Sequence, residues 1–511
     1  MGLRIGIVGA GFAGVSTAKV LASVGYDVHV FEKEPDVGGV WAASRRYPGL
    51  TTQNPRSTYA LSDFPMPDDY PEWPSGEQVQ QYFEAYIDHF DIRRLISFNT
   101  RIESARWNSE KAKWVVETQV GKAASAGREE FDYLIVCNGI FSLPSVPHYD
   151  NADAWKAAGG KILHTSEFTR LDDAKDKHVL VIGYGKSSCD VAMATLGNSA
   201  STTLIARNLV WKIPKKIAGV LNFKHLFLTR LGEGLFPYIE LRGFERFLHG
   251  WGRPLRELAL GTVQAIISAQ LKLKKIGLHP GKPLETIARS TVSLVTPGFY
   301  EAVKEGTLGV EKNAEVTRLE PGKAVLSNGK ELPADLIVAG TGWQQKVPFL
   351  SPDVMSRITN ADGDFLLYKS MLPMGVPNLL FNGYNSSFFS QLNCEVGAMW
   401  IAEYLRGGVA IPAREIRQAD VERRLAWMRE RTDGKHCHGT NIVPFSVHHI
   451  DELLNDIDLN IGVSARFKQW FVALDPSDYA QNHAKLASRA GAGRNMAPGA
   501  TASPRSEYAV S

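Results

Sequence analysis

The stretch "RIGIVGAGFAGVSTAKVL", residues 4–21, combines a short apolar strand, a glycine-rich turn and the start of a helix. The glycines of the turn follow the G-x-G-x-x-G spacing. The first permits a tight turn, the second lets the backbone approach a pyrophosphate, and the third lets helix and strand pack closely. The N–H groups that begin the helix suit phosphate oxygens. We therefore predict a Rossmann-type dinucleotide site formed by Gly9, Ala10, Gly11, Phe12, Ala13 and Gly14.

The next strand strengthens this prediction. "YDVHVFEKE", residues 26–34, is expected to form the second strand, and Glu32 stands where that strand ends. This is the spacing at which a carboxylate binds ribose hydroxyls in dinucleotide-binding folds. The first site therefore includes Glu32.

A second strand, turn and helix occur at "VLVIGYGKSSCDVA", residues 179–192, in which Ser188 replaces the third glycine. Near the end of its paired strand, "STTLIARN", residues 201–208, Arg207 stands where the first site has a carboxylate. A guanidinium binds a 2′-phosphate through charge-assisted hydrogen bonds, whereas a carboxylate repels it. The second site is therefore predicted to bind NADP through Gly183, Gly185, Lys186, Ser187, Ser188 and Arg207.

Two unlike nucleotide sites in one chain have an economical explanation, which is a resident FAD at the first site reduced by NADPH at the second. The expected fold is α/β, with two Rossmann-like domains and the NADP-binding domain inserted into the FAD-binding domain. We expect "ADLIVAGTGW", residues 334–343, to rejoin the first sheet. The predicted parts are the FAD-binding domain at 1–150, the NADP-binding domain at 151–330, a return to the FAD domain with the C-terminal region at 331–484, and a disordered tail at 485–511.

Composition excludes several classes of function. The 511 residues include 44% hydrophobic and 22% charged side chains, and the net charge of +3 comes without a long basic run, which argues against nucleic acid as a partner. The four cysteines are far apart and form no C-x-x-C pair, which favours a reducing, cytoplasmic compartment. "HCH", residues 436–438, is interpreted as a surface loop, and no metal is expected. We expect no signal peptide and no transmembrane segment.

The stretch from 215 to 275 is rich in Phe, Leu, Trp and basic residues, as in "KHLFLTRLGEGLFPYIELRGFERFLHGWGRPLREL". The favoured interpretation is a helical insertion that packs onto the core of the NADP-binding domain. Two alternatives remain open, namely an amphipathic lid over an apolar substrate channel and a surface in peripheral contact with a membrane. Oligomerisation also stays open.

The motifs "GAGFAG", "FEKEPDVGGVW", "LSDFPMPDDYP", "GKILHTSEF", "GYGKSSCD" and "VAGTGW" occur in the same order as in the flavin-containing monooxygenases, which the chain resembles over roughly residues 3–410. This family is one of the class B flavoprotein monooxygenases, a group that also includes the Baeyer–Villiger enzymes. The resemblance implies that NADPH reduces the flavin. The reduced flavin then captures O₂ as a C4a-(hydro)peroxide, and one oxygen atom passes to a small organic substrate.

The resemblance also implies roles for individual residues. Val40 and Trp41 of "GGVW" would line the FAD. "AGTGW" corresponds to the family's strand that links the two domains near the nicotinamide, which adds Thr341 and Gly342 to the cofactor-binding residues.

The resemblance implies a catalytic asparagine beside the flavin, but the side chain at the corresponding position of this chain is one methylene longer. Counted without gaps, the family's flavin-side asparagine aligns with Gln53, preceded by Thr52 and followed by Asn54. The expected catalytic residues are therefore Gln53 and Asn54, with Thr52 as a cofactor contact. The preceding "RYPG", residues 46–49, is similar to a stretch of the Baeyer–Villiger enzymes.

The family's fingerprint of aromatic, glycine, histidine and aromatic residues corresponds here to Ala158, Gly160, His164 and Phe168. Its final Phe168 favours N- or S-oxygenation of a small apolar substrate, because Baeyer–Villiger enzymes usually have Trp there. Baeyer–Villiger oxidation of a ketone and an uncoupled NADPH oxidase or flavin reductase remain the alternatives. His164 is either a hinge residue or a buried, hydrogen-bonded histidine between the domains.

Overall fold

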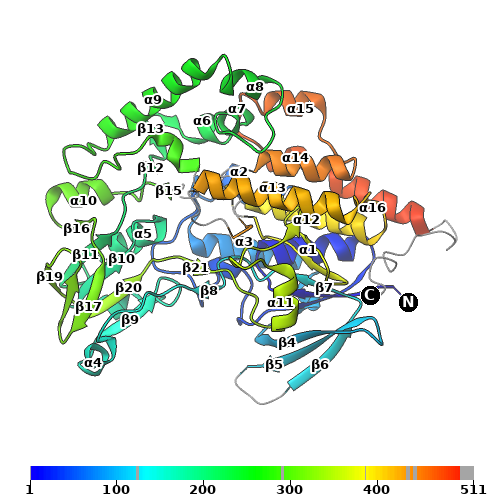
Figure 1. Ribbon diagram of the computed structural model, residues 1–511, viewed down its shortest axis with the longest axis horizontal. Helices are drawn as coiled ribbons and strands as arrows, with labels where there is room; N and C mark the ends of the chain where they lie inside the picture. Colours follow the sequence, from blue (N-terminus) through cyan, green and yellow to red (C-terminus); the bar gives the residue numbers. More distant parts are fainter. Residues whose placement is uncertain are drawn as a thin grey trace.

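Two five-stranded parallel sheets organise the chain in the computed structural model (Figure 1), which describes residues 2–121, 126–288, 293–385, 387–432, 438–440 and 446–494. The first sheet has the order β24-β7-β1-β2-β3. Its strands are β24 (Leu379–Phe381), β7 (Tyr133–Val136), β1 (Arg4–Val8), β2 (Asp27–Phe31) and β3 (Ile96–Ser97).

The first sheet is buried on both faces, which explains why its strands are apolar almost throughout. On one side, α1 (Phe12–Ser23) packs against β1, β2 and α12 (Ser390–Leu405). On the other side, Val8 and Phe31 join a core with Trp114 of the antiparallel sheet β4-β5-β6. In this sheet β4 pairs antiparallel with β5, with Thr100 opposite Val120 and Asn108 opposite Lys113. This sheet contains β4 (Thr100–Asn108), β5 (Lys113–Val120) and β6 (Ala126–Phe131).

The second sheet has the order β16-β11-β10-β20-β9. Its strands are β16 (Gly309–Lys312), β11 (Ser201–Ala206), β10 (His178–Ile182), β20 (Leu336–Ala339) and β9 (Lys161–His164). Helix α5 (Lys186–Thr195) packs on β10, β11 and β20. The chain returns to the first sheet at β24, after every strand of the second sheet. The prediction of two Rossmann-like domains, one inserted into the other, is therefore confirmed.

One expected strand assignment is wrong. The stretch 334–343 was predicted to rejoin the first sheet, but its strand β20 pairs with β10 and β9 of the second sheet. An apolar parallel strand fits the middle of either sheet equally well, so burial alone could not assign it. The return expected from residue 331 takes place at β24.

The remaining strands form small sheets. The antiparallel group is β17 (Val316–Glu320), β18 (Lys323–Leu326) and β19 (Glu331–Pro333). The strand pairs are β12 (Lys212–Ile213) with β15 (Ser293–Leu294), β13 (Lys216–Ile217) with β14 (Leu221–Asn222), β21 (Trp343–Gln344) with β8 (Leu143–Pro144), and β22 (Leu367–Tyr368) with β23 (Leu372–Pro373).

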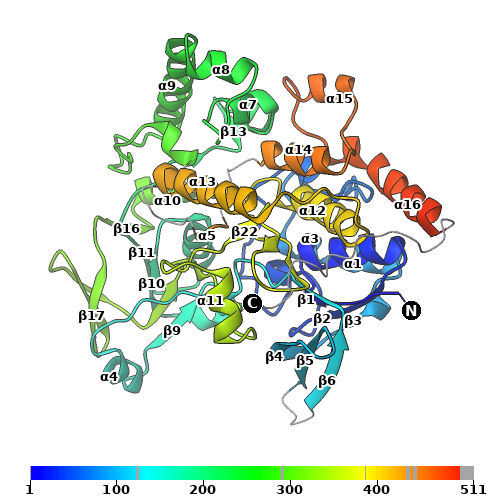
Figure 2. The same cartoon turned by 45° about the vertical axis from the view of Figure 1, so that its right-hand side comes forward.

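The stretch 215–275 contains helices, as the sequence predicts, which extend away from the two sheets (Figure 2). They are α6 (Lys224–Phe227), α7 (Arg230–Gly234), α8 (Phe244–His249) and α9 (Arg253–Gln270). The other helices are α2 (Arg56–Tyr59), α3 (Gly76–His89), α4 (Ala152–Ala157), α10 (Phe299–Glu305), α11 (Pro352–Ile358), α13 (Arg414–Thr432), α14 (Val447–Asp456), α15 (Val463–Lys468) and α16 (Gln481–Arg494). Short 3₁₀ helices are η1 (Gly39–Trp41), η2 (Arg93–Leu95), η3 (Leu171–Ala174), η4 (Leu284–Ala288) and η5 (Pro476–Tyr479).

The predicted disordered tail begins too early. Residues 485–494 belong to α16, whose Asn482 donates a hydrogen bond to the carbonyl oxygen of Leu459 at 2.8 Å. The Ala, Lys, Leu and Arg residues of this stretch are good helix formers, and the helix is stable because it has a surface to pack on. The rest of the predicted tail, 495–511, lies outside the described residues. Within the described part of the chain, no helix combines the length and apolarity needed to cross a bilayer.

Candidate functional site

The first glycine turn has the geometry that its sequence predicts. Gly9 has a φ of +102°, and a β-carbon there would lie 2.8 Å from the carbonyl oxygen of Cys137. A β-carbon on Gly14 would lie 1.8 Å from the carbonyl oxygen of Gly9. Gly11 is different, because its φ of −84° suits any residue and the nearest atom to an added β-carbon is the Cα of Gly39 at 3.7 Å. The space beside Gly11 therefore lets a ligand approach the backbone.

Helix α1 begins at this turn without a capping side chain and without an acidic residue in its first turn. Its first N–H groups and the positive end of its dipole are therefore available to an anion. Glu32, at the end of β2, is buried, and its carboxylate accepts hydrogen bonds from the N–H groups of Ala10 at 2.7 Å and Glu34 at 2.9 Å. Burial raises the pKa of Glu32, and these two donors oppose the rise. The residues fit the pyrophosphate and ribose of a dinucleotide.

The second turn repeats this arrangement at the end of β10. Gly183 has a φ of +112°, and a β-carbon there would lie 2.5 Å from the carbonyl oxygen of Gly340. Gly185 has a φ of −73° and open space where a β-carbon would stand, and α5 also starts without a side-chain cap. The hydroxyl of Ser188 donates to the carbonyl oxygen of Gly340 at 3.3 Å, so serine at the third glycine position ties α5 to the residue after β20.

A buried polar network joins α5 to the first domain. The ammonium of Lys186 donates to Asp190 at 2.5 Å, and both side chains are buried. Asp190 also accepts hydrogen bonds from the hydroxyls of Thr296 at 2.5 Å and Tyr47 at 3.2 Å. Burial raises the pKa of Tyr47, and the charge of Asp190 adds to the rise. The network therefore couples the second glycine turn to the segment that contains Tyr47.

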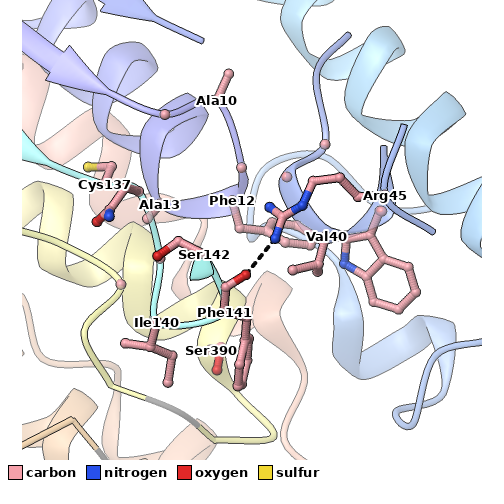
Figure 3. A pocket seen from close by; sticks show the side chains of 18 of the residues that line it. Ala10, Phe12, Ala13, Val40, Arg45, Cys137, Ile140, Phe141, Ser142 and Ser390 are labelled. Atoms are coloured by element: carbon pink, nitrogen blue, oxygen red, sulfur yellow. Dashed lines mark hydrogen bonds between the residues drawn. The ribbon is translucent and has the colours of Figure 1, made fainter. Parts of the chain in front are cut away.

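A single cavity of about 520 Å³ adjoins both turns. Figure 3 shows part of its wall, in which Arg45 donates to the carbonyl oxygen of Phe141. Sequence-predicted site residues that line this cavity are Gly9, Ala10, Gly11, Phe12, Ala13, Glu32, Val40, Trp41, Gln53, Asn54, Lys186 and Ser187. Two helix N-termini, predicted from motifs more than 170 residues apart, thus open into one space.

Other predicted site residues do not line this cavity among the residues that the structure describes, namely Gly14, Thr52, Gly183, Gly185, Ser188, Arg207, Thr341 and Gly342. Thr52 instead donates its hydroxyl to the carbonyl oxygen of Asn54 at 2.8 Å, and it supports the loop from behind. Arg207 is at the end of β11, with a side chain 75% exposed, and pairs with Glu315 at 3.3 Å. It is therefore accessible to a nucleotide on the second turn.

The two candidate catalytic amides differ in their surroundings. Asn54 is 1% exposed, and its amide nitrogen donates to the carbonyl oxygen of Phe388 at 2.8 Å. Gln53 is half-buried, and its amide oxygen accepts from the N–H of Leu294 at 3.1 Å. Both amides line the cavity, but the contacts of Asn54 hold it within the loop, which makes Gln53 the more adaptable of the two.

His164 is a buried, hydrogen-bonded histidine in the connection between the two sheets. It is fully buried at the end of β9, and Nε2 lies 3.1 Å from the carbonyl oxygen of Gly342 while Nδ1 lies 2.9 Å from the hydroxyl of Ser166. Burial lowers the pKa of His164, which favours the neutral ring. The hydroxyl of Thr341 donates to the carbonyl oxygen of Ser145 in the same connection. His164 and Thr341 thus hold the backbone that links the two domains.

Two residues that line the cavity were not predicted from the sequence. The guanidinium of Arg45 lies 5.4 Å from the ring centroid of Trp343, and both residues line the cavity. Trp343 also contacts His164 edge-on, with ring centroids 4.5 Å apart. Burial lowers the pKa of Arg45, with Glu34 as the strongest opposing charge. The cation–π pair depends on the meeting of the two domains, which neither local motif encodes.

A cluster of Asp63, Glu395 and His483 has ligand-type atoms within 4.8 Å of one another. The ammonium of Lys19 lies in the same cluster, hydrogen-bonded to Asp63 and 2.8 Å from Nδ1 of His483. Because a cation already neutralises these carboxylates, we interpret the cluster as the anchor of α16 on α1 and α12. In the "HCH" stretch, residues 436 and 437 lie outside the described residues.

Comparisons with known proteins agree with this geometry. The family model described as flavin-binding monooxygenase-like matches residues 2–240. The probable flavin-containing monooxygenase 1 of Arabidopsis thaliana is 26% identical, with 89% of this chain and 92% of the relative covered. The human flavin-containing monooxygenase 1 is also 26% identical, with 90% and 84% covered.

Solved structures share the fold. An S-allyl-L-cysteine S-oxygenase from Allium sativum has a TM-score of 0.63 at 19% identity, with 96% of this chain and 98% of that chain covered. A steroid monooxygenase bound to NADP has a TM-score of 0.65 at 20% identity, with 89% and 97% covered. Fold, site and family model together define a flavin-dependent monooxygenase. Residues 2–240 match the family model, and the 26% identical relatives cover about nine tenths of the chain, so the resemblance to the flavin-containing monooxygenases is confirmed.

Proposed function

We propose that the chain holds FAD at the first turn and NADPH at the second, and that it transfers one oxygen atom from O₂ to a small apolar organic substrate. The observation that carries this proposal is the shared cavity. Gly11 of the first turn and Lys186 and Ser187 of the second turn line the same space. A hydride donor on one turn can therefore reach an acceptor on the other.

The two ends of the site support different nucleotides. Glu32 is a buried carboxylate at the first strand end, which suits ribose hydroxyls and disfavours a 2′-phosphate. Arg207 presents an exposed guanidinium at the second strand end, which suits a 2′-phosphate. FAD at the first site and NADPH at the second match this difference in charge.

Hydride acceptance and O₂ activation are the chemistry that a bound flavin supplies. The chain's residues would position the cofactors and exclude water. Trp41 and Phe388 give the cavity apolar walls, and the amide of Gln53 offers a neutral hydrogen-bonding group without an acidic proton. Gln53 also contacts Leu294 of the second domain, so its position depends on how the domains meet.

We favour N- or S-oxygenation as the reaction. Phe168 ends the fingerprint in the way that distinguishes the amine- and sulfur-oxidising branch, and relatives that match about nine tenths of the chain carry the name flavin-containing monooxygenase. Baeyer–Villiger oxidation is the second candidate. The "RYPG" stretch favours it, because this stretch resembles the Baeyer–Villiger enzymes and its Tyr47 lines the same cavity.

A disulfide reductase fits the cavity less well. Cys137 and Cys394 both line it, but burial raises the pKa of Cys137 to about 12 and also raises the pKa of Cys394. Thiols that stay protonated are poor partners for a flavin.

The test uses the purified chain loaded with FAD. We expect the flavin absorbance to bleach when NADPH is added without oxygen. With oxygen, mass spectrometry of a panel of thioethers, tertiary amines and ketones should find products heavier by one oxygen atom, chiefly sulfoxides or N-oxides. Ester products from the ketones would favour the second candidate. Peroxide equal to the NADPH consumed, with every substrate, would overturn oxygen transfer.

A further inference from the structure

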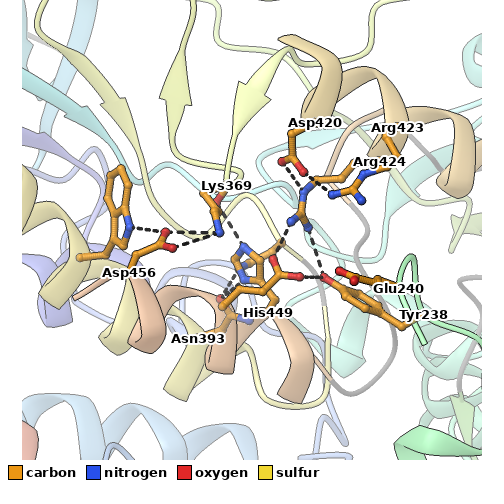
Figure 4. A network of polar contacts seen from close by, with 12 residues as sticks. Tyr238, Glu240, Lys369, Asn393, Asp420, Arg423, Arg424, His449 and Asp456 are labelled. Atoms are coloured by element: carbon orange, nitrogen blue, oxygen red, sulfur yellow. Dashed lines mark hydrogen bonds and ion pairs between the residues drawn. The ribbon is translucent and has the colours of Figure 1, made fainter. Parts of the chain in front are cut away.

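A buried chain of polar side chains leads from the C-terminal region to the wall of the cavity. Asn385 lines the cavity and is 6% exposed, and its amide nitrogen donates to Oδ1 of Asn393 on α12. His449, on α14, is fully buried. Its Nδ1 lies 3.4 Å from the amide nitrogen of Asn385 and 3.0 Å from Oδ1 of Asn393. Its Nε2 lies 3.2 Å from the carbonyl oxygen of Lys369 (Figure 4).

The tautomer of His449 follows from these neighbours. Burial lowers the pKa of His449 to about 3, so the ring is neutral and has one proton. A carbonyl oxygen can only accept, so the proton is on Nε2, which donates to Lys369. Nδ1 is therefore an acceptor. The two hydrogens of the Asn385 amide then have two acceptors, Nδ1 of His449 and Oδ1 of Asn393.

A strained turn holds the other nitrogen of the ring. Lys369 and Ser370, between β22 and β23, both have left-handed backbone angles, with φ of +54° and +59°. Two successive non-glycine residues in this region are unfavourable, and the surrounding contacts must offset the strain. α14 supplies these contacts, because the carbonyl oxygen of Lys369 accepts from His449 and its ammonium pairs with Asp456 at 3.3 Å. The ring of His449 is therefore fixed at the nitrogen that does not face Asn385.

This arrangement leaves an amide oxygen unpaired at the cavity. Oδ1 of Asn385 is buried and has no hydrogen-bond partner among the described residues. The same holds for Oε1 of Gln391, which also lines the cavity and is 4% exposed. Buried polar atoms without a partner are rare in folded proteins, since each has lost its hydrogen bonds to water. Two such oxygens on residues that line one cavity indicate that a ligand supplies the donor.

The missing donor is a group without charge. Glu32 is the one carboxylate among the described residues that line the cavity, and its oxygens already accept from Ala10 and Glu34. A charged ammonium would therefore leave water for a wall that offers it no unpaired carboxylate, which is unfavourable. A neutral N–H needs only a neutral acceptor, and the amide oxygens of Asn385 and Gln391 are of this kind.

We propose that Asn385 accepts a hydrogen bond from a neutral N–H group of the ligand in the cavity, and that His449 is the positioning residue that holds the Asn385 amide for this contact. This role rests on the proposed function, which supplies two sources of such a group, the imide N3–H of the flavin and the N–H of a neutral amine substrate. His449 lies beyond residue 240, where the match to the family model ends. The C-terminal region therefore contributes to the site.

Two affinities separate the sources. The first is the Kd of the flavin-free chain for FAD and for FAD methylated at N3, measured by flavin fluorescence. If the flavin is the donor, Asn385→Leu should weaken FAD binding about fivefold or more and leave binding of the methylated FAD unchanged. Asn385→Ala removes the same oxygen without a leucine to accommodate, and should repeat this result.

The second affinity is the Kd of the FAD-loaded chain for N-methylaniline and for N,N-dimethylaniline, measured by the change in the flavin spectrum. Both amines are neutral at pH 7.5, and only the first has an N–H. If the substrate is the donor, the wild type should prefer N-methylaniline about fivefold, and Asn385→Leu should remove the preference.

His449→Gln and His449→Asn form a matched pair. Glutamine places its amide near the position of Nε2 and keeps a donor for Lys369, whereas asparagine places its amide near Nδ1 and keeps an acceptor for Asn385. We expect His449→Gln to reproduce the loss of Asn385→Leu, and His449→Asn to keep the affinity within about twofold of the wild type. Asn385→Leu combined with His449→Gln should bind as Asn385→Leu does, because His449 acts through Asn385.

Asn482→Leu is the control, because Asn482 is 2% exposed and donates to the carbonyl oxygen of Leu459 at 2.8 Å, outside the cavity. It should lower the free energy of unfolding and leave both affinities unchanged. Wild-type FAD affinity and amine preference in Asn385→Leu would overturn the role of Asn385. Equal losses in the two His449 variants would overturn that of His449. A wild-type chain that binds no FAD would refute the proposed function, and these roles with it.

Discussion

Gly11 and Gly185 occupy equivalent places in the two turns, and both have backbone angles that alanine can adopt. An added methyl group meets no closer atom than 3.7 Å at Gly11 and open space at Gly185. Gly11→Ala should therefore fold normally but lower FAD affinity about tenfold or more, because the methyl group stands where a pyrophosphate approaches. Gly185→Ala should keep its flavin and lose reduction by NADPH. Flavin absorbance and anaerobic bleaching measure the two effects.

Gly261→Ala is the control for these variants. Gly261 is an exposed position inside α9 with open space around it, so alanine should stabilise the helix slightly and leave both cofactors bound. If Gly11→Ala retained wild-type flavin affinity, the first turn would not hold the pyrophosphate.

Arg207 distinguishes the two nicotinamide cofactors. Arg207→Ala should raise the KM for NADPH about tenfold or more and leave the KM for NADH nearly unchanged, because only NADPH carries the 2′-phosphate. Steady-state NAD(P)H oxidation measures both constants. Arg170→Ala, at an equally exposed arginine, serves as the control. Equal increases for both nucleotides would contradict the role of Arg207.

Residues with a backbone role were the most predictable from the sequence. Glycine spacing identified Gly9 and Gly183, because their positive φ angles and close neighbours follow from the turn itself. Arg45 and Trp343 could not be found this way, since their contact arises only when two domains meet. Thr52 was assigned to the cofactor by its place in the sequence, but its side chain supports the loop from behind.

At the scale of elements, the sequence predicted which segments are strands better than which sheet they join. β20 is apolar on both faces, and the sequence of such a strand does not indicate which of two parallel sheets it joins. Residues 485–494 of α16 were predicted as disordered because the stretch from 485 onward is rich in Ala, Gly, Ser and Pro and has few large apolar groups. The helix also contains His483, which contacts Lys19, Asp63 and Glu395 and so attaches the start of α16 to segments distant in the sequence.

His448 joins the helical insertion to α14, and its ionisation should make that joint sensitive to pH. Nδ1 donates to Glu233 of α7, and Nε2 lies 2.6 Å from Glu245 of α8. Burial alone would lower the pKa of His448, but the two carboxylates outweigh it and raise the pKa to about 10. Between pH 6.5 and 10 the folded protein therefore binds more protons than the unfolded chain. The stabilisation is complete below pH 6.5 and lost by pH 10.

His448→Gln removes the cation and leaves two buried carboxylates unpaired. We expect this variant to lose about 3 kcal/mol or more of unfolding free energy near pH 6.5, with a difference from wild type that shrinks towards pH 10. Urea unfolding across this pH range measures the difference. His225→Gln, at an exposed position in the same insertion, should follow the wild type. A difference that grows with pH would contradict the charged state of His448.

At the scale of the whole molecule, the placement of one sheet beside the other creates the cavity. Polar side chains fix that placement. Figure 4 shows such a network in the C-terminal region, where Arg424 reaches Tyr238 of the insertion at 3.2 Å and Asp420 at 2.9 Å. At the cavity, the corresponding contact is the hydrogen bond that the Tyr47 hydroxyl donates to Asp190. A reaction that must keep water out therefore depends on contacts that belong to no single domain.

Tyr47→Phe tests this dependence, because it removes a hydroxyl and preserves the ring. A hydrogen bond to a carboxylate contributes about 1.5–3 kcal/mol, so its loss should loosen α5 against the first domain without unfolding either sheet. The cavity would then admit water, and the peroxide released per NADPH consumed should rise several-fold while FAD content stays constant. Tyr70→Phe, at a half-exposed tyrosine, provides the matched control. An unchanged ratio of peroxide to NADPH in Tyr47→Phe would mean that other contacts hold the domains together. The Lys186–Asp190 pair would then stabilise only the second domain.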